Sequence, residues 1–184
     1  MKRVFIVHCW DGSPRQGWYP WLKKELEKKG FSVKAPAMPG SENPKISRWV
    51  PFLAKLVKKA DKDTFFVGHS IGCQAILRYL QAINEKIGGA VFVAGWFHLL
   101  PEATEEEGAD KIARPWLKTR IDFKRIGKSR FTAIFSDNDP YVPLSDSKIF
   151  RKKLGARIII EHKKGHFSAG RIPSVLREIT RMAK

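Results

Sequence analysis

The chain has 184 residues, of which 43% are hydrophobic and 29% are charged, and its formal net charge at pH 7 is +17. This composition excludes a disordered chain, and no apolar run approaches the ~20 residues that a membrane-spanning helix needs. The length fits one domain over residues 1–184, and the two cysteines, Cys9 and Cys73, exclude a disulfide scaffold or a zinc site of Cys-x-x-Cys type.

Apolar runs alternate with amphipathic stretches, which predicts a parallel sheet covered by helices on both faces. Strands are expected over residues 3–8, 31–35, 64–67, 89–94, 131–135 and 157–162. Helices are expected over residues 17–29, 44–59, 71–84, 145–154 and 171–183. The stretch from Trp96 to Arg130 contains no clean strand, and such an excursion often forms a pocket wall. The predicted fold is therefore a three-layer α/β fold with about six mostly parallel strands.

A possible nucleophile follows the third predicted strand, in the sequence Gly68-His69-Ser70-Ile71-Gly72. A Gly-x-Ser-x-Gly pattern between a strand and a helix is typical of a nucleophile elbow, a sharp turn that holds the serine in strained backbone geometry. Glycines two residues before and after the serine leave the room that the turn requires. The same pattern also fits a glycine-rich turn around a buried serine, so the assignment of Ser70 depends on the rest of the chain.

An acid and a histidine follow in the order that this chemistry uses, which is Ser, then Asp or Glu, then His. The strand over residues 131–135 leads to Asp137 and Asp139, and the strand over residues 157–162 leads to His166. We expect His166 to take the proton of Ser70 and Asp139 to orient His166. The stretch from Asp139 to Pro143 resembles the Asp-x-x-Val-Pro pattern of α/β-hydrolases, in which the first residue is the triad acid. Asp137 is the alternative acid and is otherwise expected to form an Asx turn with its own backbone.

The loop after the first predicted strand, His8-Cys9-Trp10-Asp11-Gly12, is polar and rich in turn residues. By position it resembles the His-Gly-x-x-Gly loop of the α/β-hydrolases, with Cys9 in place of the first glycine. That loop supplies one backbone N–H of an oxyanion hole, and the residue after the nucleophile supplies the other. We therefore expect the N–H groups of Trp10 and Ile71 to be the two oxyanion donors.

Several large apolar side chains are candidates for an acyl pocket, because binding pockets are mostly apolar with a few polar groups. The candidates are Trp96 and Trp116 first, followed by Phe97, Leu99, Tyr141 and Phe167. For each of them, packing in the core beneath a long loop is an equally open interpretation.

Motifs along nearly the whole chain resemble a family of small, lidless serine hydrolases related to retinoblastoma-binding protein 9 and the bacterial YdeN-type proteins. They are Gly17-Trp18-Tyr19-x-Trp21-Leu22-Lys23-Lys24-Glu25-Leu26-Glu27, Ala37-Met38-Pro39, Trp49-x-Pro51-Phe52, Gly68-His69-Ser70, Arg114-Pro115-Trp116, Asp139-Pro140 and Gly165-His166-Phe167. The resemblance implies an α/β-hydrolase core that acts on a small ester, amide or thioester without a metal or cofactor. It departs at Ile71, where relatives often have a small residue.

The positive charge raises a second hypothesis, because strongly basic proteins often bind nucleic acid or anionic surfaces. No nucleic-acid-binding motif accompanies the charge, and the helical lysines lie opposite apolar positions, so solvated helix faces explain them. A non-catalytic protein that binds a macromolecule on the same fold is the alternative function, and a protein partner stays open. The Leu-x-Cys-x-Glu motif that binds the retinoblastoma protein is absent.

Two further expectations concern metals and location. His162 and His166 are four residues apart, but Gly165 lies between them at a strand end, so we expect no metal site. The N-terminal residues lead into a strand without the apolar core of a signal peptide, which predicts a cytoplasmic protein. The resemblance to a lidless family implies a small-molecule substrate.

Overall fold

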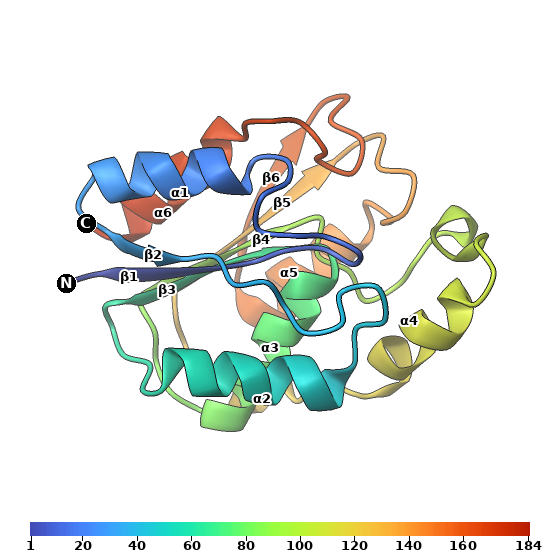
Figure 1. Cartoon of the computed structure of the whole chain (residues 1–184), viewed down its shortest axis with the longest axis horizontal. Helices are drawn as coiled ribbons and strands as arrows, with labels where there is room; N and C mark the ends of the chain where they lie inside the picture. The colour runs from blue at the N-terminus through green and yellow to red at the C-terminus, as the bar shows by residue number, and fades with distance from the viewer.

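A six-stranded sheet forms the centre of the computed structural model, which describes residues 1–184 (Figure 1). The strands are β1 (Arg3–Val7), β2 (Ser32–Lys34), β3 (Thr64–His69), β4 (Gly89–Val93), β5 (Phe131–Ser136) and β6 (Arg157–Glu161). They lie in the order β2-β1-β3-β4-β5-β6, and every neighbouring pair is parallel. The predicted parallel sheet is confirmed.

Burial of the strands follows their position in the sheet. β3, β4 and β5 are buried along their whole length, because helices cover both of their faces, and their sequences are almost continuously apolar. β6 lies at an edge and is partly exposed, with 46% of Ile160 accessible to solvent.

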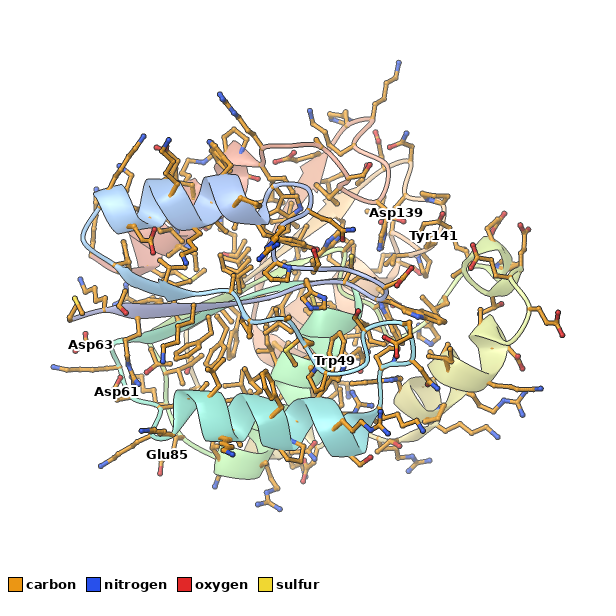
Figure 2. The ribbon with its side chains drawn as sticks, viewed as in Figure 1. Trp49, Asp61, Asp63, Glu85, Asp139 and Tyr141 are labelled. Atoms are coloured by element: carbon orange, nitrogen blue, oxygen red, sulfur yellow. The ribbon has the colours of Figure 1, made fainter.

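Five predicted helices cover the sheet, and Figure 1 shows how they divide between its faces. α1 (Tyr19–Lys28) and α6 (Pro173–Met182) lie on one face, and α2 (Ile46–Val57), α3 (Ile71–Ile83) and α5 (Asp146–Leu154) lie on the other. For α1, α2, α3 and α5 the division follows from right-handed crossovers, since the connection from β1 to β2 runs in the opposite direction to those that lead from β2 through β6. α6 follows the last strand and contacts α1. Trp49 points from α2 toward the interior in Figure 2 and is fully buried.

The ends of the predicted elements agree with the structure to within two residues. The excursion from Trp96 to Arg130 contains no strand, as expected, but it has helices that the prediction missed. These are α4 (Ala109–Lys118) and two short 3₁₀ helices, η1 (Pro101–Thr104) and η2 (Phe123–Arg125). The signal for α4 was present, because Ala109, Ala113 and Trp116 recur at helical spacing and are its buried residues.

The sheet topology places a crevice at the carboxyl ends of β1 and β3. These strands are neighbours, but the chain leaves them in opposite directions, toward β2 and toward β4, so the loops after them diverge. In Figure 2, Asp139 and Tyr141 lie at this end of the molecule, away from Asp61 and Asp63. Open α/β sheets bind ligands at such a crevice.

None of the helices combines the length and the apolar composition that a membrane crossing requires.

Candidate active site

Ser70 lies on the tight turn between β3 and α3, as the elbow pattern predicts. Its backbone has φ 53° and ψ −120°, a conformation that non-glycine residues rarely adopt. A Cβ on Gly68 would lie 2.8 Å from the backbone N of Cys73, and a Cβ on Gly72 would overlap the carbonyl oxygens of Val7 and His8. Both glycines are therefore required for α3 to approach β1 and β3 this closely.

His166 and Asp139 meet at the same end of the sheet, from the loops after β6 and β5. The Nδ1 of His166 is 2.8 Å from Oδ2 and 3.0 Å from Oδ1 of Asp139. The Asp139 side chain is 3% exposed, and its Oδ1 also accepts the backbone N–H groups of Tyr141 and Val142. These hydrogen bonds fix the carboxylate, which in turn orients the imidazole so that Nε2 is the nitrogen left for a reacting group.

Asp137 has a different histidine partner. Its Oδ2 is 2.6 Å from Nδ1 of His162, and its Oδ1 accepts the backbone N–H of Lys163 at 2.8 Å. The expectation that Asp137 forms an Asx turn with its own backbone is wrong, because its carboxylate binds the loop after β6. The hydrogen bond from Lys163 N–H, followed by that with His162, lowers the pKa of the Asp137 carboxyl. Asn138 binds the same loop through Gly165 N–H, so the two loops that hold Asp139 and His166 are joined.

Most of the backbone N–H groups in the loop after β1 donate hydrogen bonds that hold the loop in place. The N–H of Cys9 is donated to Tyr19 Oη, that of Asp11 to Ser41 O, and that of Gly12 to Cys9 O. Among the backbone N–H groups from Cys9 to Gly12, that of Trp10 has no hydrogen-bond acceptor in the protein. The N–H of Ile71 is the first of α3 and has no intrahelical acceptor.

His8 anchors this loop to the chain after β2. Its Nδ1–H donates to Cys9 O at 2.7 Å, and its Nε2 accepts the backbone N–H of Met38 at 2.9 Å. Burial lowers the pKa of His8, so the neutral ring that these two bonds require is favoured.

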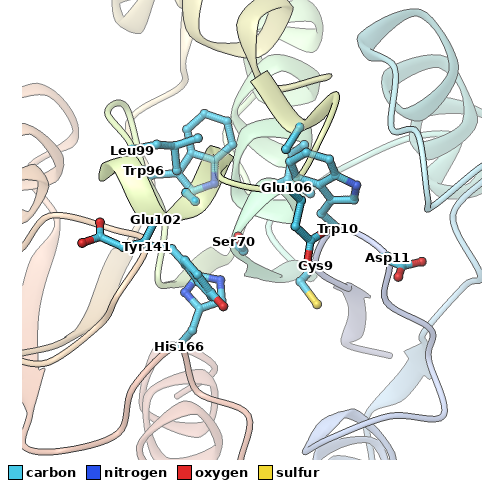
Figure 3. Close-up of a pocket in the computed structure, with 13 residues that line it drawn as sticks. Cys9, Trp10, Asp11, Ser70, Trp96, Leu99, Glu102, Glu106, Tyr141 and His166 are labelled. Atoms are coloured by element: carbon cyan, nitrogen blue, oxygen red, sulfur yellow. The ribbon is translucent and has the colours of Figure 1, made fainter. Parts of the chain in front are cut away.

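A cavity of about 280 Å³ joins these groups (Figure 3). Ser70, His166, Trp10 and Ile71 all line it, and Figure 3 shows the His166 ring beside Ser70. Its remaining lining residues are Cys9, Asp11, Trp96, Leu99, Glu102, Ala103, Glu106, Ala109 and Tyr141. Of the expected pocket residues, Trp96, Leu99 and Tyr141 are therefore present.

Three acidic residues in the lining, Asp11, Glu102 and Glu106, were not predicted. Glu102 lies on η1 and Glu106 lies between η1 and α4, in the stretch from Trp96 to Arg130 that was expected to form a pocket wall. The only available signal was the acidic composition of that segment.

Three other expected pocket residues do not line the cavity, and this part of the prediction is corrected. Trp116 is buried against Trp49 and donates its Nε1–H to Pro44 O. Phe97 packs on Phe150 and Phe123. Phe167 is fully buried, and its carbonyl accepts the Nε1–H of Trp18. Trp116 and Phe167 are core residues and Phe97 is partly buried against the core, so packing, the alternative that sequence alone could not reject, explains all three.

The two histidines of the β6 loop bind different aspartates and do not form a pair. The structure contains no group of three or more His, Cys, Asp or Glu side chains placed to bind a metal ion.

A parallel sheet with a serine on the turn after its third strand defines the class of this protein, which has the α/β-hydrolase fold. The sequence profile of the serine hydrolase family matches residues 4–175. The chain belongs to the serine hydrolase family, and it is a hydrolase.

Individual relatives agree with this membership and confirm the resemblance inferred from the motifs. YdeN of Bacillus subtilis strain 168 is 29% identical over 170 residues, which cover 90% of this chain and 86% of YdeN. The serine hydrolase RBBP9 of Rattus norvegicus is 26% identical over 167 residues, with the same two coverages.

Among solved structures, the ydeN gene product of B. subtilis superposes with a TM-score of 0.88 at 28% identity, over 100% of this chain and 99% of that one. Est1E from Butyrivibrio proteoclasticus has a TM-score of 0.77 at 15% identity, over 100% and 89% of the two chains, and shares the fold.

Proposed function

We propose that this hydrolase cleaves a small carboxylic ester, thioester or amide through Ser70, His166 and Asp139, with an acyl-enzyme intermediate. The observation that carries the proposal is the buried Asp139 carboxylate 2.8 Å from Nδ1 of His166, on a cavity that also contains Ser70 at the strained elbow. This is the relation of base and orienting acid that nucleophilic catalysis by serine requires.

In the first half of the reaction, Ser70 Oγ attacks the substrate carbonyl carbon and its proton passes to Nε2 of His166. Asp139 stabilises the imidazolium that forms. The carbonyl oxygen becomes an oxyanion, for which we propose Trp10 N–H and Ile71 N–H as donors. Such donors are effective because they are oriented before the reaction begins.

This first half ends when the oxyanion collapses, the bond between the acyl carbon and the leaving group breaks, and the imidazolium gives its proton to the leaving alcohol, thiol or amine. The acyl group stays on Ser70 Oγ, and the second half begins. A water molecule then loses a proton to His166 Nε2 and attacks the acyl carbon. The second oxyanion collapses, the bond to Ser70 Oγ breaks, and Ser70 regains its proton. The products are a carboxylic acid and the free enzyme.

The size of the cavity supports a small acyl group. Its volume, about 280 Å³, is at or below the low end of the range of ligand pockets, which is ~300–1,000 Å³. Trp10, Trp96, Leu99 and Tyr141 supply apolar walls, so a short aliphatic or single-ring acyl group is favoured over a long lipid chain.

The direct test is labelling with a fluorophosphonate, which reacts with an activated serine. We expect the wild-type protein to label and both Ser70→Ala and His166→Ala to lose labelling. His162→Ala is the matched control, because it removes a histidine that is bound to Asp137 in the same loop, and we expect it to label as wild type does.

A folded wild-type protein that does not label would contradict this proposal. The basic surface would then be the place to look for function, and salt-sensitive binding of nucleic acid would support the alternative binding role.

A further inference from the structure

His69, the last residue of β3, is buried next to Ser70, and both of its ring nitrogens are bound. Nδ1 lies 2.7 Å from Tyr19 Oη, and Nε2 lies 2.9 Å from the backbone oxygen of His166. Tyr19 Oη is also 3.2 Å from the backbone N of Cys9. The mechanism proposed above uses none of these contacts.

The chemistry of the groups fixes the direction of each hydrogen bond. A carbonyl oxygen can only accept, so His69 Nε2 carries the hydrogen that is donated to His166 O. In a neutral ring Nδ1 is then an acceptor, so the Tyr19 hydroxyl donates to it, and its oxygen accepts the Cys9 N–H. Three hydrogen bonds thus run in one direction, from Cys9 through Tyr19 and His69 to His166; we call this series the His69 relay.

The His69 relay requires a neutral His69. Burial, with a smaller contribution from the nearby His166 side chain, lowers the pKa of His69 to about 3. A protonated ring would carry a hydrogen on Nδ1 as well, so that Nδ1 could no longer accept the hydrogen bond from the Tyr19 hydroxyl. It would also put a second positive charge beside His166, whose ring centre is 5.1 Å away and becomes positive during the proposed reaction.

The two ends of the relay are the backbones of the loops that carry the proposed chemistry. Cys9 immediately precedes Trp10, the proposed oxyanion donor, and the other end is the carbonyl of His166 itself. The loop after β6 contains an unfavourable backbone conformation, because Phe167 has φ 57° in the left-handed region. Contacts from outside the loop therefore help to hold its shape. Trp18, the neighbour of Tyr19, supports the same loop by donating its Nε1–H to Phe167 O at 3.1 Å.

We propose that Tyr19 and His69 are positioning residues, which hold the Trp10 N–H and the His166 ring in register with Ser70. The inference rests on the proposed function, since it assigns a role relative to Ser70 and His166. Neither residue touches the substrate, because neither lines the cavity.

The test is the variant Tyr19→Phe, which keeps the ring but removes the hydroxyl between Cys9 and His69. We expect kcat for a small p-nitrophenyl ester to fall by about 10- to 100-fold, with KM changed little, because small misplacement of catalytic groups affects the transition state most. Tyr79→Phe is the matched control. Tyr79 is a fully buried tyrosine of α3 whose hydroxyl has no hydrogen-bond partner, so its loss should leave kcat unchanged.

Substitutions of His69 separate positioning from mere packing. His69→Gln can still present an N–H toward His166 O, whereas His69→Leu cannot. We expect kcat to decrease in the order wild type, His69→Gln, His69→Leu. The effects of Tyr19→Phe and His69→Leu should also fail to add, since both interrupt the same series of hydrogen bonds.

A measurement on the wild-type protein covers the case in which a variant does not fold. The ¹⁵N NMR spectrum of His69 should show a protonated Nε2 and an unprotonated Nδ1, without titration between about pH 5 and 8. The opposite tautomer, or a ring that titrates in this range, would overturn the inference.

The two proposals fail in distinguishable ways. If wild type labels with fluorophosphonate but Tyr19→Phe keeps the wild-type kcat, the positioning role is overturned and the proposed function stands. If folded wild type does not label, the proposed function fails, and the positioning role fails with it.

Discussion

Asp137 and Asp139 lie two residues apart, yet they bind different histidines in different surroundings. The carboxylate of Asp139 is nearly inaccessible to solvent and binds His166. The side chain of Asp137 is 36% exposed and binds His162. A carboxylate bound to an imidazole strengthens it as a base, and burial increases the effect because water screens the charges less.

We therefore expect Asp139→Asn to reduce kcat by about 10³- to 10⁴-fold, since an amide cannot hold the imidazole in the required tautomer. Asp137→Asn should change kcat by less than about tenfold, because it affects only the connection between the two loops. Steady-state hydrolysis of a small ester measures both effects. Equal losses in the two variants would contradict the assignment of Asp139 as the triad acid.

His69 makes the free energy of unfolding depend on pH. Its pKa is about 3 in the folded protein and about 6.5 in an unfolded chain. Between these two pKa values the unfolded chain binds one more proton than the folded protein. The contribution of His69 to the free energy of unfolding is therefore fully present above about pH 6.5 and is lost as the pH falls toward 3. The expected slope is about 1.4 kcal/mol per pH unit in this window.

Urea unfolding of wild type and His69→Gln at several pH values measures this slope. The variant should be less stable at pH 7, but its free energy of unfolding should fall less steeply between about pH 6 and 4. His8 has a pKa lowered by burial and contributes in the same direction in both proteins. Parallel curves for the two proteins would contradict a neutral, buried His69.

At the scale of elements, one arginine joins α3 to the segment that closes the cavity. Arg78 of α3 is buried and donates to the carbonyls of Trp116 and Thr119, at the end of α4. These carbonyls have no intrahelical donor, and a cation near a helix C-terminus is favourable. Burial lowers the pKa of Arg78 to about 10, which leaves it charged at neutral pH.

Arg78→Leu should destabilise the protein by about 2–4 kcal/mol, because the buried carbonyls of α4 lose their donors. Arg114→Leu is the matched control, since Arg114 is an exposed residue of α4 whose ion pair with Asp110 should be worth less than about 1 kcal/mol. Urea unfolding measures the stability, and hydrogen exchange should show faster opening of α4 in Arg78→Leu. Equal stability of the two variants would show that Arg78 does not fasten α4.

At the scale of the whole molecule, the charge around the cavity is opposite to the net charge. The chain carries +17, but residues 61–110 contain eight acidic and three basic residues. No lysine or arginine lines the cavity, whereas Asp11, Glu102 and Glu106 do. Anions drawn to the molecule by its net charge are therefore repelled at the cavity itself.

We expect a neutral ester to have a kcat/KM about tenfold higher at low salt than an ester of similar size with a carboxylate in its acyl group. The double variant Glu102→Gln, Glu106→Gln should reduce this preference, as should added salt. Glu105→Gln, Glu107→Gln is the control, because these neighbouring residues do not line the cavity. A preference that is the same in all three proteins would exclude an electrostatic origin.

The sequence by itself determined the six strands, the five helices that cover the sheet, their order along the chain and the elbow, but not α4 or the two 3₁₀ helices. Apolar runs such as residues 64–67 and 131–135 predict buried strands, and the glycines around Ser70 predict a tight turn, because both depend on interactions between residues close together in the chain. The chain order Ser70, Asp139, His166 and the family motifs came from the sequence as well.

Only the tertiary structure decided which residues meet across the loops. It pairs Asp139 with His166 and Asp137 with His162, buries Trp116 and Phe167 in the core with Phe97 packed against it, and brings Tyr19 to His69. In the three hydrogen-bonded pairs, the two partners are 25 or more residues apart in the sequence. Local spacing cannot choose among such partners, because the packing of the whole sheet and its helices sets the register between distant loops.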